Sequence, residues 1–319
     1  MKEFYIGLLR TDDEIQDFFM VKNIAIKIGS NKKQYLDLLL SDNTGEITAK
    51  KWDVSDGELP SLNEIVEGDV VKVKAIVTEW NGMKQLRVLR IRKSVENDGI
   101  ELSDYIRTAP EPPEDMYAYI MEKIEEFQDE ELKALCQFIM EKNKEKLMYY
   151  PAASKNHHAE LGGLLYHMKR MMMTGERICQ VYTNLNKDLV LTGVVIHDIE
   201  KINEILANEL GISSGYSFEG QMLGHLVQGI KTIDKLALEL GISREKAIML
   251  EHMILSHHYE PDFGSPKKPL FPEAEILHYL DIIDARMYDM EEALFSTDPG
   301  EFSDKVWTLD NRKLYKQKF

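Results

Sequence analysis

The first third of the chain alternates between apolar and polar positions. In residues 71–77 every second side chain is apolar and lysines fall between them, which predicts a β-strand with one buried face. A short apolar run at residues 35–40 precedes a turn cluster at residues 41–45, and Asn81 with Gly82 favours a tight hairpin. Several short strands within about 75 residues fit a small closed or nearly closed barrel. We therefore expect an all-β domain at residues 1–93.

Helical spacing of apolar residues replaces this alternation in the rest of the chain. Three prolines between residues 108 and 113 cannot continue a helix or a central strand, so we place a linker at residues 94–113. An all-α domain is expected at residues 114–295 and a polar, partly basic tail at residues 296–319. The expected helices cover residues 116–147, 161–181, 189–209, 218–240, 244–258 and 273–294.

Length and charge agree with two domains of different character. The 319 residues are long for one compact core, and 44% hydrophobic content is ample for burial. A net charge of −16 argues at first against a nucleic-acid partner. However, residues 21–93 hold 13 Lys and Arg against 10 Asp and Glu, whereas residues 94–131 hold 13 acids and two bases. The barrel is modestly basic, so nucleic-acid binding is not excluded there.

The two cysteines give no sign of a disulfide framework. Cys136 and Cys179 match no C-x-x-C spacing, so a cysteine-based zinc site has almost no support either. The N-terminal residues lack a leader pattern, and no apolar run approaches about 18 residues. We expect a soluble protein of the reducing cytoplasm, without a membrane partner.

Histidine is concentrated in the middle of the chain, because all nine lie within residues 157–278. His197 and Asp198 follow three β-branched residues, a costly place for two polar groups unless something offsets their desolvation. His167 lies upstream and Asp281 downstream. A lone histidine on an apolar face is more often a core residue, but this set offers the ligands that borderline divalent metals prefer. The pattern predicts a metal site drawn from several helices.

The order His167, His197-Asp198 and Asp281 resembles the H…HD…D signature of HD-domain metal-dependent phosphohydrolases. His225 and the Ser-His-His at residues 256–258 are similar to the longer signature of two-metal members. The surrounding motifs are Ser154-Lys-Asn-His-His158, Gly162-Gly-Leu-Leu-Tyr-His167, Gly224-His225, Gly264-Ser-Pro266 and Glu275-Ile-Leu-His-Tyr-Leu-Asp-Ile-Ile-Asp-Ala285. Together they resemble the YhaM-type 3′-to-5′ exoribonucleases, which join an N-terminal OB fold to an HD domain. The resemblance runs from about residue 15 to 295.

This resemblance implies a centre for two divalent cations. His167, His197, Asp198 and Asp281 would hold one cation, and Asp198 would bridge to a second. The second would be held by His225 and His257, with His258 as the alternative to His257, since adjacent helical residues diverge by about 100°. Mn²⁺ is the first choice and Mg²⁺ or Fe²⁺ are alternatives, because mixed His and carboxylate sites discriminate poorly among them.

The implied reaction is hydrolysis of single-stranded RNA from its 3′ end to nucleoside 5′-monophosphates, with single-stranded DNA left open as a substrate. Lys201 is expected to act on the scissile phosphate beside the catalytic Asp198. Arg244 and Lys268 are weaker choices for the same contact. His157 would contact substrate, although a capping or packing role is as good an explanation.

The barrel would bind the same strand. Its turn region at residues 42–53 resembles nucleic-acid-binding OB folds, where aromatic faces stack bases and lysines follow phosphates. The stacking candidates are Tyr35, Trp52 and Trp80, and the phosphate candidates are Lys50, Lys51 and Arg87. Any one aromatic in so small a barrel is more often core than platform.

One position departs from the family, which usually has a small residue where this chain has Glu200. Glu200 would either pair with Lys201 and weaken phosphate binding or point to solvent. Two other functions therefore stay open: a nucleotide phosphohydrolase with a regulatory barrel, and an RNA-binding protein without catalysis. Assembly into a homo-oligomer is also left open.

Overall fold

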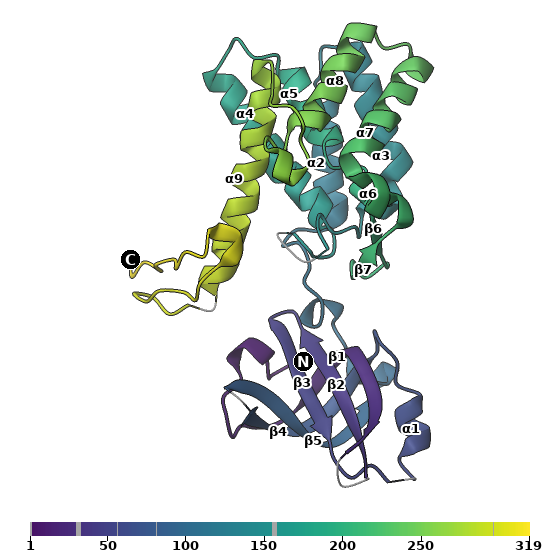
Figure 1. The fold of residues 1–319 in the computed structure, drawn as a ribbon, viewed down its shortest axis with the longest axis vertical. Helices are drawn as coiled ribbons and strands as arrows, with labels where there is room; N and C mark the ends of the chain where they lie inside the picture. The colour runs from purple at the N-terminus through teal and green to yellow at the C-terminus, as the bar shows by residue number, and fades with distance from the viewer. Residues whose placement is uncertain (1, 30–32, 56, 81, 155–157, 296) are drawn as a thin grey trace. The chain divides into compact units, whose positions relative to one another are not determined.

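The computed structural model describes residues 2–29, 33–55, 57–80, 82–154, 158–295 and 297–319. The chain forms two compact units, Met1–Thr108 and Ala109–Phe319, shown as ribbons in Figure 1. The division falls inside the stretch expected to be a linker, so residues 94–108 belong to the first unit. The reason is local: Tyr105 and Ile106 are buried, and Asn43 N–H donates to the carbonyl of Asp104.

The first unit is a closed five-stranded barrel with the strand order β1-β2-β3-β5-β4, the topology of an OB fold. Its strands are β1 (Glu14–Ile28), β2 (Gln34–Asp42), β3 (Gly45–Lys51), β4 (Val70–Trp80) and β5 (Met83–Lys93), with a short helix α1 (Leu59–Asn63) between β3 and β4. The long β1 pairs with β4 through its first half and with β2 through its second, changing partner near a bulge at Val21. The parallel pairing of β3 with β5 closes the barrel.

Alternation along the strands builds the barrel core, as the sequence predicts. In β4 the apolar side chains at residues 71, 73, 75 and 77 are all buried, and so is Phe19 of β1. Trp80 pairs with Met83 across the predicted hairpin, where Gly82 adopts a φ of 77° that favours glycine. Asn81 of this turn lies outside the described residues. An all-β barrel followed by helices is therefore the correct fold class.

The second unit is helical apart from one two-stranded ribbon. Its elements are α2 (Pro113–Glu125), α3 (Glu130–Leu147), α4 (Gly163–Val181), α5 (Lys187–Ile196), α6 (Lys201–Glu204), β6 (Ile205–Ala207), β7 (Ser213–Tyr216), α7 (Phe218–Leu240), α8 (Arg244–Ser256) and α9 (Pro272–Phe295). None of the helices formed by the described residues is long and apolar enough to cross a bilayer.

Two expected helices are wrong in extent. The helix expected at residues 116–147 is two, because the Asp129 side chain accepts from Glu131 N–H and Leu132 N–H and so starts α3. The helix expected at residues 189–209 stops at Ile196. The chain then turns through the His-Asp pair, forms the short α6 and enters the β6–β7 ribbon, which the apolar periodicity did not indicate.

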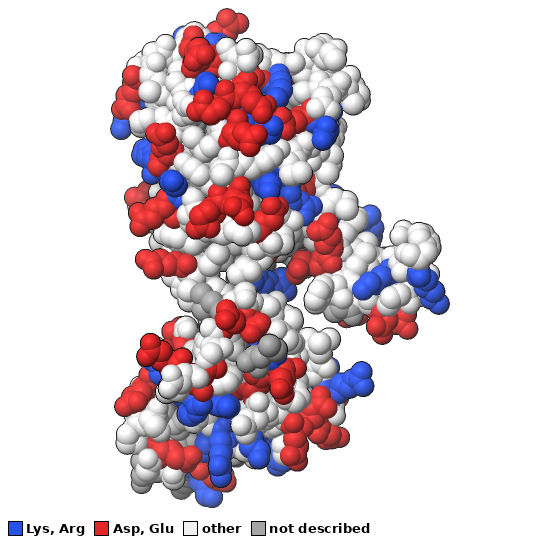
Figure 2. Space-filling model, turned by 180° about the vertical axis from the view of Figure 1, so that it is seen from behind, with Lys and Arg blue, Asp and Glu red and all other residues white. Residues whose placement is uncertain are grey.

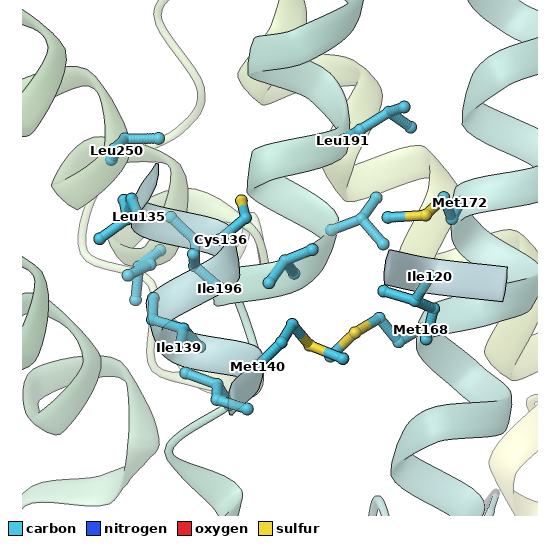
Figure 3. Close-up of a cluster of buried hydrophobic side chains, with 14 of the residues drawn as sticks. Ile120, Leu135, Cys136, Ile139, Met140, Met168, Met172, Leu191, Ile196 and Leu250 are labelled. Carbon is cyan, nitrogen blue, oxygen red and sulfur yellow. The ribbon is translucent and has the colours of Figure 1, made fainter. Parts of the chain in front are cut away.

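Helix α5 lies at the centre of the helical unit and carries the metal-site sequence at its end. All its residues from Leu189 to Ile196 are buried, including five β-branched residues that sequence propensity alone would favour in a strand. Figure 3 shows the core that covers it, where Ile120 of α2, Cys136 of α3 and Met168 of α4 converge on the same space. Burial on every side fixes the direction in which the chain leaves α5.

Candidate metal centre

Five helices bring the predicted ligands together. His167 lies on α4, His197 and Asp198 follow α5, His225 lies on α7, His257 and His258 follow α8, and Asp281 lies on α9. The described residues hold three groups of His and Asp side chains whose ligand atoms all lie within 4.8 Å of one another, and two of these groups overlap at Asp198. One group is His167, His197 and Asp198, and the other is Asp198, His225, His257 and His258. Asp198 is common to both groups.

Asp281 borders the first group, since its Oδ1 lies 3.4 Å from Nε2 of His167. His257 and His258 both belong to the second group, whereas the sequence suggested that only one would face a metal. Helix α8 ends at Ser256, His257 keeps helical φ and ψ, and the centres of the two imidazole rings lie 4.2 Å apart.

Every imidazole in these groups has its Nδ1 bound to a fixed acceptor. The pairs are His167 with Asp284 Oδ2 at 2.7 Å, His197 with Val194 O at 2.9 Å, His225 with Glu204 Oε2 at 3.0 Å, His257 with Ile254 O at 2.9 Å, and His258 with Phe263 O at 2.6 Å. Carbonyl and ionised carboxylate oxygens only accept, so Nδ1 carries the hydrogen in each ring. When a ring is neutral, its lone pair is therefore on Nε2, the atom that faces the common space and can bind a metal.

Three buried polar atoms at this point have no hydrogen-bond partner among the described residues. They are Asp198 Oδ1, His225 Nε2 and His257 Nε2. Asp198 Oδ1 lies 3.3 Å from His225 Nε2 and 3.8 Å from His257 Nε2, so the three atoms converge. Leaving such groups unsatisfied is costly, and a divalent cation would satisfy all three. The residues present therefore fit a metal ion of the kind that prefers nitrogen and oxygen ligands.

The electrostatics of the centre shift the pKa values of His167 and His257 in opposite directions. Burial opposes a charge on His167, but hydrogen bonds and charges from Asp281 and Asp284 outweigh it and raise the pKa of this imidazole to about 9. Burial and the neighbouring His258 hold the pKa of His257 well below its usual range. His257 is therefore neutral near pH 7 and ready to coordinate, while a metal must displace a proton from His167.

Lys201 lies in the first turn after the His-Asp pair and is nearly buried. Its Nζ is 2.6 Å from Asp198 Oδ2. Burial works against a charge here, but Asp198 outweighs it and raises the pKa of Lys201. Asp198 thus directs Oδ2 towards Lys201 and Oδ1 towards the imidazoles of the second group.

Behind His167 lies a buried network that sequence reasoning underused. Asp284 Oδ2 accepts from His167 and is 2.8 Å from Nε2 of His158, whose ring stacks 4.1 Å from that of Tyr288. Arg170 Nε lies 2.5 Å from Asp284 Oδ1. The signal in the sequence was Asp284 itself, one helical turn after Asp281. The predicted substrate contact, His157, lies outside the described residues, and the structure places its neighbour His158 in the core.

Two glycines allow the chain to reach this geometry. A Cβ on Gly163 at the start of α4 would lie 2.1 Å from the carbonyl oxygen of His158, so no side chain fits there. Gly224 interrupts α7 with a φ of 66° just before His225. The break lets Glu204 Oε1 accept from the His225 N–H while Oε2 accepts from its ring.

Glu200 takes neither of the two positions expected of it. It is buried rather than exposed, and its carboxylate accepts from Thr232 Oγ1 at 2.7 Å and Asn203 Nδ2 at 2.6 Å. Lys201 directs its amine to Asp198 instead. Glu200 therefore joins the start of α6 to α7 and does not compete for the phosphate contact.

The two weaker phosphate candidates lie away from the ligand groups. Arg244 is exposed at the first residue of α8 and pairs with Asp234 and Glu251, about 20 Å along the helix from His257. It does not join the site. Lys268 is exposed on the connection between α8 and α9, with its Nζ 4.5 Å from the centre of the Tyr259 ring. Because Tyr259 in turn stacks on His278, Lys268 lies nearer the metal centre.

On the barrel, three of the predicted contacts gather in one place. The rings of Tyr35 and Trp52 are 4.7 Å apart, and Lys50 Nζ is 5.8 Å from both. Trp52 is 49% exposed and Trp80 is more so. Trp80 lies at the far end of β4, at the hairpin, and is not part of this cluster.

The lysine after Lys50 is different. Lys51 is buried and binds Glu58 at 2.8 Å, because its side chain faces the opposite side of the strand. It is therefore not a phosphate contact. Arg87 is exposed on β5 directly beside Lys50.

Comparison with known proteins follows the same division of the chain. Residues 164–286 match the HD domain family. The barrel is similar to a domain of replication protein A from Methanococcus maripaludis, with 25% identity, 28% of this chain and 92% of that chain covered, and a TM-score of 0.24. It is also similar to a replication protein A heterotrimer bound to single-stranded DNA, with 16% identity, coverage of 30% and 68%, and a TM-score of 0.23.

One curated relative matches along almost the whole chain. It is the 3′-5′ exoribonuclease YhaM of Geobacillus sp. (strain WCH70), which is 38% identical over 307 residues. These residues cover 96% of this chain and 93% of the relative. Both the barrel and the His/Asp cluster lie within that span, and the chain therefore belongs to the family of YhaM 3′-5′ exoribonucleases, with an OB-fold barrel and an HD domain.

Proposed function

We propose that this protein hydrolyses single-stranded RNA from the 3′ end and releases nucleoside 5′-monophosphates. Its relative across 96% of the chain is named a 3′-5′ exoribonuclease. The observation that carries the proposal is the convergence of Asp198 Oδ1, His225 Nε2 and His257 Nε2, three buried atoms without a hydrogen-bond partner. A phosphodiester bond is cleaved by such sites when divalent cations are bound.

We assign two cations to the centre, with Mn²⁺ as the first choice. His167, His197, Asp198 and Asp281 would hold one, and Asp198, His225 and His257 would hold the other, with His258 within reach. When bound, such ions lower the pKa of a water molecule and stabilise the charge that develops on phosphorus. Mg²⁺ and Fe²⁺ stay alternatives, because mixed His and carboxylate sites discriminate poorly among these metals.

The chain's own residues orient these groups. Asp284, Glu204 and two backbone carbonyls fix which nitrogen of each ring faces the centre, so no ring has to rotate when substrate arrives. Lys201 holds Asp198 by Oδ2 and places a positive charge beside the ligand that both groups share. We keep Lys201 as the catalytic cation and Lys268 as an outer phosphate contact.

The barrel would bind nucleotides of the strand other than the reacting ones. Tyr35 and Trp52 form a stacked pair that a base can join, and Lys50 lies above both rings where a phosphate would pass. Trp80 offers a second, separate stacking position at the β4–β5 hairpin. Stacking does not depend on the 2′-hydroxyl, so the same surface would also bind single-stranded DNA, which stays open as a substrate.

The test uses full-length protein with Mn²⁺ and matched 20-nucleotide RNA and DNA strands labelled at the 5′ end. A ladder that shortens from the 3′ end, with nucleoside 5′-monophosphates detected by chromatography, is the expected result. Chelation should stop the reaction and Mn²⁺ should restore it. Intact RNA beside protein that elemental analysis shows to be loaded with metal would reject the proposal. Free nucleotides serve as the control for the phosphohydrolase alternative.

The cytoplasm is our proposed location. Both cysteines are free, Cys136 in the core and Cys179 partly buried, which suits a reducing compartment.

A further inference from the structure

Residues 302–318 form an ordered structure where the sequence predicted only a polar tail. Phe302 bridges Tyr315 and Val306 bridges Arg312 in antiparallel fashion, and a short 3-10 helix, Trp307–Leu309, lies in the loop that the inner bridge closes. Backbone hydrogen bonds join Ser303 N to Leu314 O and Lys316 N to Glu301 O. We call this segment the basic hairpin. It lies at the end of α9 that carries the C-terminus label in Figure 1.

The basic hairpin is fastened to α9, the helix that also carries Asp281. Leu309 at its tip is fully buried, and Asp310 lies 3.4 Å from Arg286. Lys316 Nζ donates to the carbonyl of Leu294 at 2.9 Å. The hairpin therefore has a fixed position relative to the metal centre within the same unit.

Its charge is opposite to that of the rest of the helical unit. Residues 302–318 hold five Lys and Arg against two Asp and Glu, whereas residues 251–301 hold twelve acids and three bases. One of the two acids, Asp310, is engaged by Arg286 and Arg312. Figure 2 shows Lys and Arg side chains on the segment that projects from the helical unit.

Three of these cations are exposed and uncommitted. The structure records no ion pair for Lys305, Lys313 or Lys318 among the residues it describes. The exposed aromatic side chains of the same segment are Phe302, Trp307 and Tyr315, and Trp307 is 70% exposed. The Phe302 and Tyr315 rings are 5.2 Å apart. Free cations interleaved with exposed aromatic rings are the composition of a single-strand-binding surface.

We propose that the basic hairpin is a second RNA-binding surface, which holds the strand a few nucleotides upstream of the 3′ end that lies in the metal centre. This inference rests on the proposed function. Phosphates would bind the three free lysines, and a base would stack on Trp307. The acidic surface elsewhere on the helical unit repels phosphates, so it leaves the hairpin as the favourable path.

The spacing along α9 sets which nucleotides it touches. The hairpin contacts α9 at Arg286 and Leu294, five and thirteen residues after Asp281. At 1.5 Å per residue these contacts lie roughly 8 to 20 Å from Asp281 along the helix axis. With about 3.4 Å between stacked nucleotides, the hairpin would reach roughly the third to sixth nucleotide from the 3′ end. An RNA of two nucleotides is too short to reach it.

The decisive experiment compares short and long substrates on full-length, Mn²⁺-loaded protein. We expect Trp307→Ala to lower kcat/KM about tenfold on a 12-nucleotide RNA, mainly through KM, and to leave a dinucleotide unaffected. Lys313→Glu should act in the same way and should lessen the slope of log KM against log salt by about one. The matched controls are Leu238→Ala, an equally exposed apolar side chain on α7, and Lys142→Glu on α3. Thermal unfolding checks that each variant folds.

A second readout locates the contact directly. A 12-nucleotide RNA with 4-thiouridine at the fourth position from the 3′ end, bound to the Asp198→Asn variant, should crosslink to a peptide within residues 302–318. Equal effects of Trp307→Ala on both substrate lengths, or crosslinks only elsewhere, would overturn the inference even though the RNA is degraded. A wild-type protein that leaves all RNA intact would instead overturn the proposed function. Hairpin variants that change the oligomeric state in light scattering, with RNA kinetics unchanged, would assign the surface to a second copy of the chain.

Discussion

The metal centre and the aromatic cluster of the barrel are built in opposite ways. In the metal centre the imidazoles are held through Nδ1 by backbone carbonyls or carboxylates, most of them buried. In the barrel, Tyr35, Trp52 and Lys50 contact one another, with Trp52 exposed and the other two half-buried. The first arrangement fixes atoms before anything binds, whereas the second offers faces that a flexible strand can use in several ways.

This difference teaches where substitutions should be severe. Removing a group from the buried centre leaves other buried polar atoms without a partner, and their cost adds to the lost contact. Removing an exposed ring loses only the stacking it provided. Single substitutions should therefore reduce activity most in the metal centre and much less on the barrel.

Asp198→Asn should have the largest effect, because Asp198 is the only residue shared by both ligand groups. The substitution keeps the shape but removes the charge, and it leaves Lys201 without its anion. We expect nuclease activity to fall by about a thousandfold or more, since several kcal/mol of charge stabilisation are lost. Initial rates on labelled RNA and elemental analysis measure this. A variant that keeps both metal and activity would show that the centre is elsewhere.

Asp284→Asn tests whether the acceptors behind the rings matter as much as their geometry suggests. The carboxylate accepts from His167 and also binds His158 and Arg170. Loss of such an outer partner typically weakens metal affinity by about 10- to 100-fold. Isothermal titration with Mn²⁺ measures it, and Asp262→Asn, an exposed residue of the connection between α8 and α9, is the control. Equal affinity in both variants would contradict a positioning role.

The same contrast explains what the sequence could predict. His197 and Asp198 stood out because two polar residues after a run of buried β-branched residues need a compensating partner. The barrel was predictable because alternation of apolar residues directly records one buried face. In both cases the burial of these residues is visible in the order of apolar and polar residues along the sequence.

The remaining features depend on contacts that no local pattern records. Glu200 looked exposed or paired with Lys201, but it reaches Thr232, which is 32 residues away. Lys51 looked equivalent to Lys50, yet strand register turns it towards Glu58. His257 and His258 join one group at the end of α8, and helix ends are where the sequence is least informative.

Metal affinity should depend on pH through His167. Its pKa is raised to about 9, so below that pH a metal must displace a proton from the ring. The affinity for metal should therefore fall by up to about tenfold for each unit by which the pH is lowered. The stability of the metal-free protein should depend on pH in the opposite direction. The protonated ring stabilises the fold below about pH 6.5, and this contribution is lost as pH rises through 9. Mn²⁺ titrations and thermal unfolding between pH 6 and 9 test both directions. An affinity for Mn²⁺ that does not change over this pH range would contradict a protonated His167 in the metal-free centre.

Trp52→Ala tests the exposed aromatic cluster of the barrel. Loss of one stacked base costs about 1–3 kcal/mol, so the Kd for a 20-nucleotide RNA should rise about tenfold. Hydrolysis of a dinucleotide should be unchanged because we propose that the barrel binds nucleotides other than the reacting ones. Fluorescence anisotropy with Asp198→Asn protein measures Kd without degradation. Val66→Ala, another exposed apolar side chain of the first unit, is the matched control. If Trp52→Ala also slowed dinucleotide hydrolysis, the barrel would act on the reacting end itself.

Glu200→Gly should have the smallest effect on catalysis, although Glu200 lies two residues from Asp198. Its carboxylate is buried and accepts from Thr232 and Asn203, so its removal loses both hydrogen bonds and should lower the free energy of unfolding by about 1–3 kcal/mol. Activity at 25 °C should stay within about twofold of wild type, because Lys201 and Asp198 keep their own contact. Thr232→Val removes one of the two donors and should reproduce part of the loss of stability. A Glu200→Gly protein with unchanged unfolding temperature and several-fold faster hydrolysis would show instead that this carboxylate restrains the metal centre. Glu200 would then count among the residues that control the reaction.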